Sequence, residues 1–145
     1  MENFAYEISE TARVIRRAFD RSAAVLGTTR AQWRVLARLS REDAARQVDL
    51  AEALDVEPIT LCRMVDRLEE AGLVERRRDD ADRRAWRIHL TDRSRPLIDE
   101  LHGIAEIFLA DMLAGIDEPD LEAAKRVLSR VRENLLDREA KMKAS

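Results

Sequence analysis

The chain has 145 residues, a single cysteine and a formal net charge of −3. This length suits one compact subunit, and one cysteine excludes an internal disulfide, which favours a reducing, cytoplasmic setting. Although 46% of the residues are hydrophobic, no apolar run approaches the 18 residues of a membrane span, and the amino terminus lacks the features of a secretion signal.

The first part of the chain predicts two helices. Apolar residues recur every three or four positions over residues 4–26, which predicts an amphipathic helix that ends at Gly27. Thr29 and Gln32 have the spacing of a capping box, in which each side chain accepts a hydrogen bond from the other residue's backbone N–H. A second helix is therefore expected to begin directly after Thr29.

The segment 48–71 predicts two further helices that are joined by a tight turn. The apolar residues of the first, short helix are Val48, Leu50, Ala51 and Leu54. Asp55 is expected in the left-handed conformation that closes this helix, which aspartate tolerates better than most residues. Pro58 then begins the second helix, and Gly72 stops it.

The helix 58–71 has two distinct faces. Its inward stripe consists of Leu61, Met64, Val65 and Leu68. Thr60, Arg63 and Arg67 follow one another along the opposite side at steps of three and four residues. A helix in the major groove of DNA presents such side chains to base edges and phosphates. The alternatives are a surface ion pair of Arg63 with Asp66 or Glu70, and an ion pair or phosphate contact for Arg67.

After Gly72 the apolar period changes from helical to two. Residues 73–78 and 86–91 then read as two strands, and the polar segment 79–84 reads as the tip of a hairpin between them. A helix-turn-helix followed by such a hairpin is a winged helix. The predicted fold is therefore mainly α, a winged helix-turn-helix with a small two-stranded β-wing at 74–90, flanked by terminal helices.

The predicted wing concentrates positive charge in an acidic chain. The stretch from Arg76 to Arg87 has six arginines and three aspartates, a formal charge of +3. The local field decides binding because charges are screened beyond about 8 Å at physiological salt. Phosphate contacts and internal ion pairs remain equal alternatives for Arg76, Arg77, Arg78, Arg83 and Arg87.

Two more helices are expected in the last third of the chain. Thr91 is predicted to cap the first of them and Pro96 to kink it, with a break between Gly115 and Pro119. The last helix has an apolar seam over 121–135, which is expected to pack on a partner chain. The tail 140–145 is expected to fray.

Several of these motifs occur together in one known family. The segments "QWRVLARL", "DLAEALDVEPITLCRMVDRLEEAGLVERR", "DDADRRAWRIHLT" and "RPLIDEL" resemble the multiple-antibiotic-resistance regulators (MarR), and most closely their SlyA-like branch. The resemblance covers residues 29–101. It implies a homodimeric transcription regulator, usually a repressor, that binds pseudo-palindromic, inverted-repeat operators in double-stranded DNA. Small aromatic or phenolic molecules release such proteins from DNA.

The resemblance also assigns parts of the chain. Residues 1–28 correspond to an N-terminal dimerisation helix, 29–91 to the DNA-binding winged helix-turn-helix, and 92–145 to C-terminal dimerisation helices. Arg84 matches the wing arginine that enters the minor groove, and Asp82 matches the acidic residue that orients it. The DNA-binding residues expected in this way are Thr60, Arg63, Arg67, Arg78, Asp82, Arg83 and Arg84.

Family members bind their effector between the first, second and fifth helices. The candidates here are Arg13, Arg17, Phe19, Trp33 and His102, although each could equally be an ordinary core or surface residue. Peroxide-sensing members have a reactive cysteine in the first helix, where this chain has none. Cys62 is therefore expected to act as a small apolar residue.

Two functions other than DNA binding make different demands on the sequence. A winged helix can serve as a protein–protein interaction module without DNA binding, and such a protein would shift no promoter fragment at low salt. An enzyme would need a nucleophile–base pair, a phosphate-binding glycine loop or a metal cluster, and the sequence shows none of these. We therefore predict no catalytic residue, no cofactor and no metal site. The operator, the effector and the direction of regulation stay open.

Overall fold

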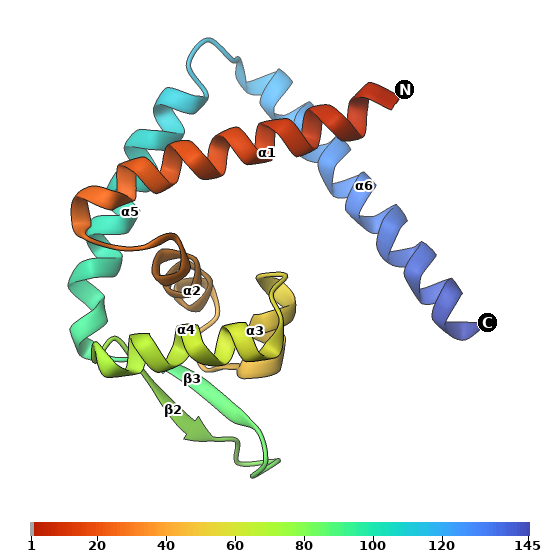
Figure 1. Cartoon of the computed structure of the whole chain (residues 1–145). Coiled ribbons are helices and arrows are strands. Elements are labelled where there is room, and N and C mark those ends of the chain that lie inside the picture. The colour runs from red at the N-terminus through yellow and green to blue at the C-terminus, as the bar shows by residue number, and fades with distance from the viewer. Residues whose placement is uncertain (1) are drawn as a thin grey trace. The chain divides into compact units, whose positions relative to one another are not determined.

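The structure is a computed structural model that describes residues 2–145. Its helices and strands, drawn in Figure 1, are α1 (Glu2–Ala23), α2 (Arg30–Arg41), β1 (Ala45–Arg46), α3 (Gln47–Ala53), α4 (Pro58–Glu70), β2 (Val74–Arg78), β3 (Trp86–Leu90), α5 (Arg95–Met112) and α6 (Glu118–Ala144). The chain divides into two units, one that ends at Phe108 and one that comprises Leu109–Ser145.

The predicted end of α1 and start of α2 are confirmed. Gly27 has a left-handed φ of 72° after a short 3₁₀ turn at the end of α1. The capping box is complete: the backbone N–H of Gln32 donates to Thr29 Oγ1 at 3.2 Å, and that of Thr29 donates to Gln32 Oε1 at 3.0 Å. These bonds satisfy amide groups that the first turn of α2 leaves without helical partners.

The helix-turn-helix is also confirmed in its turn and its end. Asp55 has a φ of 52°, and Pro58 is the first residue of α4. Gly72 has a φ of 74°, and the N–H of Leu73 donates to Leu68 O at 2.9 Å, which closes the end of α4.

The prediction that Val48 lies on the apolar face of α3 was wrong. Val48 is 62% exposed, because the first turn of α3 directs it away from the core.

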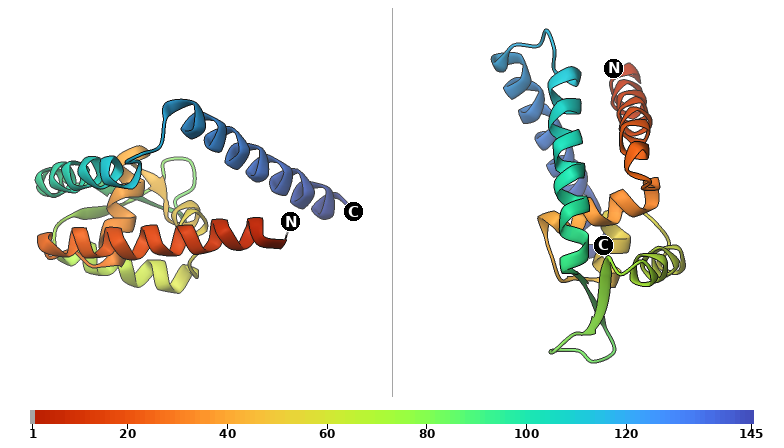
Figure 2. Two further views of the ribbon diagram at one scale, coloured as in Figure 1. Left: turned by 90° about the horizontal axis from the view of Figure 1, so that it is seen from above. Right: turned by 90° about the vertical axis from the view of Figure 1, so that its left-hand side faces the viewer.

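The wing sheet has three strands, so the prediction of a two-stranded ribbon was incomplete. The strand order is β1-β3-β2, all antiparallel, with Val74 opposite Leu90, Arg78 opposite Trp86 and Ala45 opposite Ile88. β1 is two residues long, too short to show a period in the sequence. The hairpin of β2 and β3 starts beside α4, and its tip projects beyond that helix (Figures 1 and 2).

One hydrophobic core lies under the helix-turn-helix and the sheet. Its fully buried side chains include Leu36 and Leu39 of α2, Leu50 of α3 and Ile88 of β3. Leu61, Val65 and Leu68 of α4 are also completely buried, as their predicted inward stripe requires. Burial of a leucine or isoleucine side chain contributes about 1.5–3 kcal/mol, so this core fixes the position of α4 and of the sheet.

Three predictions after the wing were wrong or only partly right. Thr91 has the N-cap position of a 3₁₀ turn over Asp92–Ser94 that leads into α5, but its side chain makes no capping hydrogen bond; its Oγ1 donates to Gly72 O at 2.6 Å. Pro96 consequently lies in the first turn of α5, where no helical N–H is required of it, rather than at a kink. The tail does not fray at residue 140, because α6 continues through Ala144.

The predicted break between the last two helices is present. Gly115 has a φ of 80°, and Asp117 caps α6, its Oδ1 accepting from the N–H of Asp120 at 3.1 Å. The apolar seam of α6 is largely exposed within the described residues, with Leu135 54% exposed.

Candidate nucleic-acid interface and effector cavity

The outer face of α4 is polar and open. Thr60, Arg63 and Arg67 are exposed, on the side of the helix opposite its buried stripe. Their side chains form no hydrogen bond or ion pair with residues 3–145. Asp66 accepts from Arg76 Nη2 at 2.7 Å, and among residues 3–145 Arg63 pairs with neither Asp66 nor Glu70. The face therefore has the free donors that contact with phosphates or base edges requires.

Arg76 is directed inward. It forms ion pairs within the protein and is therefore not a candidate for phosphate contact. Its Nη1 lies 3.0 Å from Glu69 Oε1, and its Nη2 donates to Cys62 O at 3.0 Å as well as to Asp66. Its Nε donates to Gln47 Oε1 at 3.2 Å. One guanidinium thus joins β2 to α3 and α4, which fixes the base of the wing relative to the outer face of α4.

Asp79 organises the tip of the wing. It is 4% exposed, and its Oδ1 accepts from the N–H groups of Ala81 at 2.8 Å and Asp82 at 3.3 Å. Its Oδ2 lies 3.0 Å from Arg87 Nε and 3.3 Å from Arg46 Nε. The pKa of Asp79 is lowered mainly by the N–H of Ala81; burial opposes the shift, and the Asp82 N–H and the two guanidinium groups reinforce it.

Asp82 contacts the backbone of Arg84 rather than its guanidinium. Its Oδ1 accepts from the Arg84 N–H at 3.1 Å, and its Oδ2 lies 3.7 Å from Arg46 Nη2. Asp82 therefore shapes the main chain on which the Arg84 side chain is mounted. Neither Asp79 nor Arg46 was singled out in the sequence; the hydrogen bonds of Asp79 to the N–H groups two and three residues later are an Asx turn, which aspartate favours.

The remaining wing arginines divide into engaged and free side chains. Arg78 stacks on Trp86 at 3.9 Å from the ring centroid and donates to Arg83 O at 2.9 Å. Arg77 pairs with Glu75, and Arg87 donates to Ala44 O at 2.8 Å. The side chains of Arg83 and Arg84 are exposed and have no such partner among residues 3–145.

A small apolar cavity lies in the first unit, between α1, α2 and α5. Its volume is about 80 Å³, and its lining consists of Phe19, Trp33, Leu36, Ala37, Ser40, Ile98, Leu101, His102 and Ala105. Three of the five predicted effector residues are thus brought together. Two of them are packed edge to face, with the Phe19 and Trp33 centroids 4.7 Å apart, and the Trp33 Nε1–H donates to Asp20 Oδ1 at 2.8 Å.

The other two predicted effector residues do not line this cavity. Arg13 is bound to Glu10 on the exposed side of α1, its Nη2 lying 2.8 Å from Glu10 Oε2. Arg17 is exposed as well. The polar groups at the cavity are instead Ser40 and His102, whose Oγ and Nε2 atoms are 3.4 Å apart.

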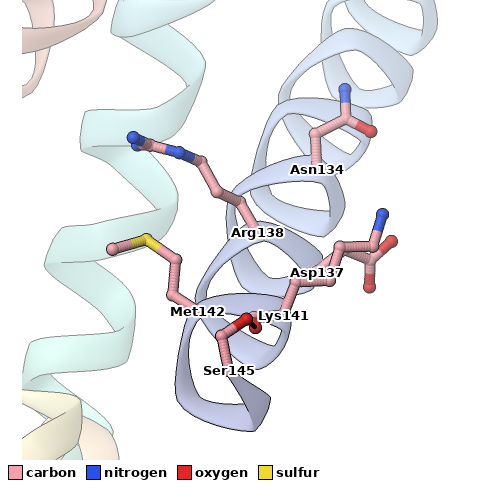
Figure 3. A pocket seen from close by; sticks show the side chains of 6 residues that line it. All are labelled: Asn134, Asp137, Arg138, Lys141, Met142 and Ser145. Atoms are coloured by element: carbon pink, nitrogen blue, oxygen red, sulfur yellow. Dashed lines mark hydrogen bonds between the residues drawn. The ribbon is translucent and has the colours of Figure 1, made fainter.

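A second hollow lies on α6 alone. Figure 3 shows Arg138 and Met142 extending to one side of the helix and Asp137 to the other. The lining residues are Asn134, Asp137, Arg138, Lys141, Met142 and Ser145. Residues from a single helix provide no opposing wall, so this hollow does not enclose a ligand.

Three further features bear on function. Within residues 2–145 no three metal-ligating side chains are grouped, and no helix in that range is long and apolar enough to cross a membrane. Cys62 is half-buried, and its Sγ lies 3.6 Å from Arg76 Nη2.

The chain is similar to known transcription regulators. The family model described as "MarR family" matches residues 28–86. The solved structure of transcriptional regulator PA3341 is 38% identical, with a TM-score of 0.86, and the match covers 92% of this chain and 98% of that one. A MarR transcriptional regulator from Methanosarcina mazei Go1 is 27% identical with a TM-score of 0.83, and the match covers 94% and 99% of the two chains.

A third structure shares the fold at lower identity. CouR from Rhodococcus jostii RHA1, solved with p-coumaroyl-CoA bound, is 23% identical with a TM-score of 0.76, and the match covers 88% of this chain and 90% of that one. The extent of the match to PA3341, together with the family model over the winged helix-turn-helix, establishes the family. This chain belongs to the MarR family of transcriptional regulators.

Proposed function

We propose that this protein is a homodimeric repressor of the SlyA-like branch that binds inverted-repeat operators and acts without catalysis. The observation that carries the proposal is the pair of free cationic surfaces on one winged helix. Arg63 and Arg67 are unpaired on the outer face of α4, and Arg83 and Arg84 project from a wing tip that Asp79 holds in shape. The α4 face suits the major groove, and an arginine at the tip suits the negative potential of the minor groove.

A second copy of the chain is the partner that we propose for the exposed apolar residues of the terminal helices. These residues are Phe4, Tyr6 and Val14 on α1, Ile107, Leu109 and Met112 on α5, and Val127, Leu128, Leu135 and Leu136 on α6. Two copies related by a twofold axis would place their α4 helices about 34 Å apart, one turn of the double helix. The operator should therefore be an inverted repeat.

Operator binding should be strongly dependent on salt, because each neutralised phosphate releases counterions. If the dimer neutralises about four phosphates, affinity should fall roughly a hundredfold between 50 and 200 mM salt. Fluorescence anisotropy with fragments that the protein selects from its own genome measures this slope. The absence of any shift at low salt would favour the alternative, a protein–protein interaction module.

We further propose that the cavity beside Trp33 receives a small apolar or aromatic effector that releases DNA. Its apolar lining, with Ser40 and His102 as polar groups, supports the proposal, and so does the ligand in the related fold of CouR. The volume of about 80 Å³ sets a limit, since an engineered cavity of 150 Å³ is known to hold benzene. A ring would therefore require Phe19 or Trp33 to move, whereas a short acyl group would not.

Filling the cavity should separate effector response from DNA binding. Ala105→Leu adds three carbon atoms at the lining, so we expect the concentration of a small aromatic acid that releases half of the operator to rise at least about tenfold. Operator affinity without the acid should stay within about threefold of wild type. Glu106→Leu, at the exposed neighbouring position, is the control and should leave both quantities unchanged. Equal release of DNA from Ala105→Leu and wild type would exclude this cavity as the effector site.

A further inference from the structure

One face of α2 has a row of arginines that DNA binding does not explain. Arg30, Arg34, Arg38 and Arg41 follow at steps of four, four and three residues, so they lie along one side of the helix. Like charges at this spacing destabilise a helix by a few tenths of a kcal/mol per pair. The row therefore lowers the stability of α2, and packing of the apolar face of the helix does not require it.

Arg34 is the fixed member of the row. It is half-buried, and its Nη2 donates to Leu54 O at the end of α3 at 2.6 Å. Its pKa is lowered first by burial and then by the positive charges of Arg30 and Arg16, with partial compensation from Asp20 and Asp55. The charged groups around Arg34 are thus two arginines, Arg30 and Arg16, and two carboxylates, Asp20 and Asp55.

Three of these arginines, Arg34, Arg38 and Arg41, line an open groove between α2 and the end of α3. The groove has a volume of about 220 Å³, and its lining consists of Trp33, Arg34, Ala37, Arg38, Arg41, Ala53 and Leu54. Arg38 and Arg41 are exposed, and neither forms an ion pair with another of the residues 3–145. Their guanidinium groups are therefore available for the bidentate contacts that arginine makes with phosphate oxygens.

The groove adjoins the apolar cavity. Trp33 and Ala37 line both, so the two spaces share this part of α2 as a wall. Asp20 accepts from the Trp33 indole and lies 3.8 Å from Arg30 Nε, which holds the dividing side chain in place. An apolar recess and a cationic groove on either side of one indole suit a ligand that has an apolar end and a polyanionic end.

We propose that this groove binds the phosphate groups of the effector, whose apolar end enters the cavity: a small acyl or aromatic acid in thioester linkage to a pantetheine arm, which a pyrophosphate joins to a nucleotide, as in coenzyme A thioesters. The inference rests on the proposed effector cavity. A free carboxylate needs only one guanidinium, whereas the groove offers three.

The groove is formed by α2 and the end of α3, and the turn between α3 and α4 lies on the opposite side of α4 from the wing tip (Figure 1). Operator DNA on α4 and the wing would leave it accessible.

The test is isothermal titration calorimetry of the full-length protein with four probes: isobutyryl-coenzyme A, coenzyme A, isobutyrate and inorganic pyrophosphate. The variant Arg38→Ala/Arg41→Ala removes the two exposed guanidinium groups and leaves Arg34, with its bond to Leu54, in place. Arg21→Ala, an exposed arginine of α1 outside the groove lining, controls for the loss of a positive charge. Operator affinity and the oligomeric state are measured on the same samples.

We expect wild type to bind isobutyryl-coenzyme A at least about tenfold more tightly than isobutyrate, and to bind coenzyme A and pyrophosphate detectably. The double variant should lose most of this advantage, about tenfold or more, while its operator affinity and oligomeric state stay as in wild type; Arg21→Ala should change nothing.

Equal binding of the phosphorylated and free acids, or equal binding by wild type and the double variant, would overturn the groove proposal. A loss of operator affinity or of the dimer in the double variant would overturn it too, because the arginines would then serve DNA or the partner subunit. Failure of wild type to bind operator DNA would instead refute the proposed regulator. The two failures are therefore distinguishable.

Discussion

Arg84→Ala is expected to weaken operator binding by about 10- to 100-fold while the protein remains folded and dimeric. A well-placed arginine in a groove contributes about 1–3 kcal/mol to the free energy of binding. Each loss of about 1.4 kcal/mol raises the dissociation constant tenfold. In this structure the Arg84 side chain has no partner among residues 3–145 to lose, so its removal should not affect folding. Fluorescence anisotropy on a selected operator measures the affinity, and analytical ultracentrifugation measures the dimer.

Arg77→Ala is the matched control for this effect. It removes the same charge from the same wing, but Arg77 is already paired with Glu75 on β2. We expect a change of about threefold or less, mainly through the long-range field. An Arg84→Ala protein that binds the operator as tightly as the Arg77→Ala protein would show that the wing tip does not enter the DNA.

Asp79→Asn is expected to lower operator affinity by about tenfold even though Asp79 itself need not touch DNA. An asparagine Oδ1 can still accept from the N–H groups of Ala81 and Asp82, but its amide would place N–H donors against the guanidinium groups of Arg46 and Arg87. Arg87 would then lack its carboxylate, and Arg46 would keep only its 3.7 Å contact with Asp82, so the connection of the tip to β1 would be weakened. The main chain that carries Arg84 would then have to be ordered at the moment of binding, which costs about 1–2 kcal/mol for each residue fixed.

Asp80→Asn provides the control. Asp80 is the exposed neighbour of Asp79, and its substitution removes the same charge from the wing tip. That variant should bind the operator about as well as wild type or slightly better, since one negative charge near phosphate is removed. Hydrogen exchange of the amides of residues 79–85 should accelerate in Asp79→Asn and not in Asp80→Asn. Equal protection in the two variants would refute the organising role of Asp79.

The lowered pKa of Asp79 also fixes the pH range of this effect. A carboxyl whose pKa is lower in the folded state stabilises the fold above its unfolded pKa, near 4, and this contribution is lost as pH falls through the lower folded value. Wing organisation through Asp79 should therefore be constant between pH 5 and 8. A loss of amide protection at the tip within that range, measured by hydrogen exchange, would contradict this assignment.

Local signals in the sequence determined most of the helical framework. The capping box at Thr29 and Gln32, the left-handed Asp55 and the stop at Gly72 are short-range interactions, so the residue types alone specify them. The two faces of α4 follow from helical periodicity in the same way. These local features place Thr60, Arg63 and Arg67 on the outer face of α4 without reference to any tertiary contact.

The wing shows what the sequence could not decide. Three aspartates, at 79, 80 and 82, are equivalent by residue type, and only the family resemblance assigned Asp82 the role of orienting Arg84. The buried position belongs to Asp79 because β1, more than 30 residues earlier, pairs with β3 and brings Arg46 to it. Arg76 likewise belongs to the interior only because α3 and α4 supply its acceptors.

The predicted effector residues also include some that the sequence could place and some that only the tertiary structure could place. Periodicity places Phe19 and Trp33 on the inner faces of their helices, but it cannot tell which of several arginines shares their space. The structure joins Phe19, Trp33 and His102 in one cavity and leaves Arg13 and Arg17 outside it. The sequence by itself thus determined the elements and their apolar faces, because those depend on neighbours within one or two turns. Only the tertiary structure decided which charged side chains are paired and which are free, because their partners come from distant parts of the chain.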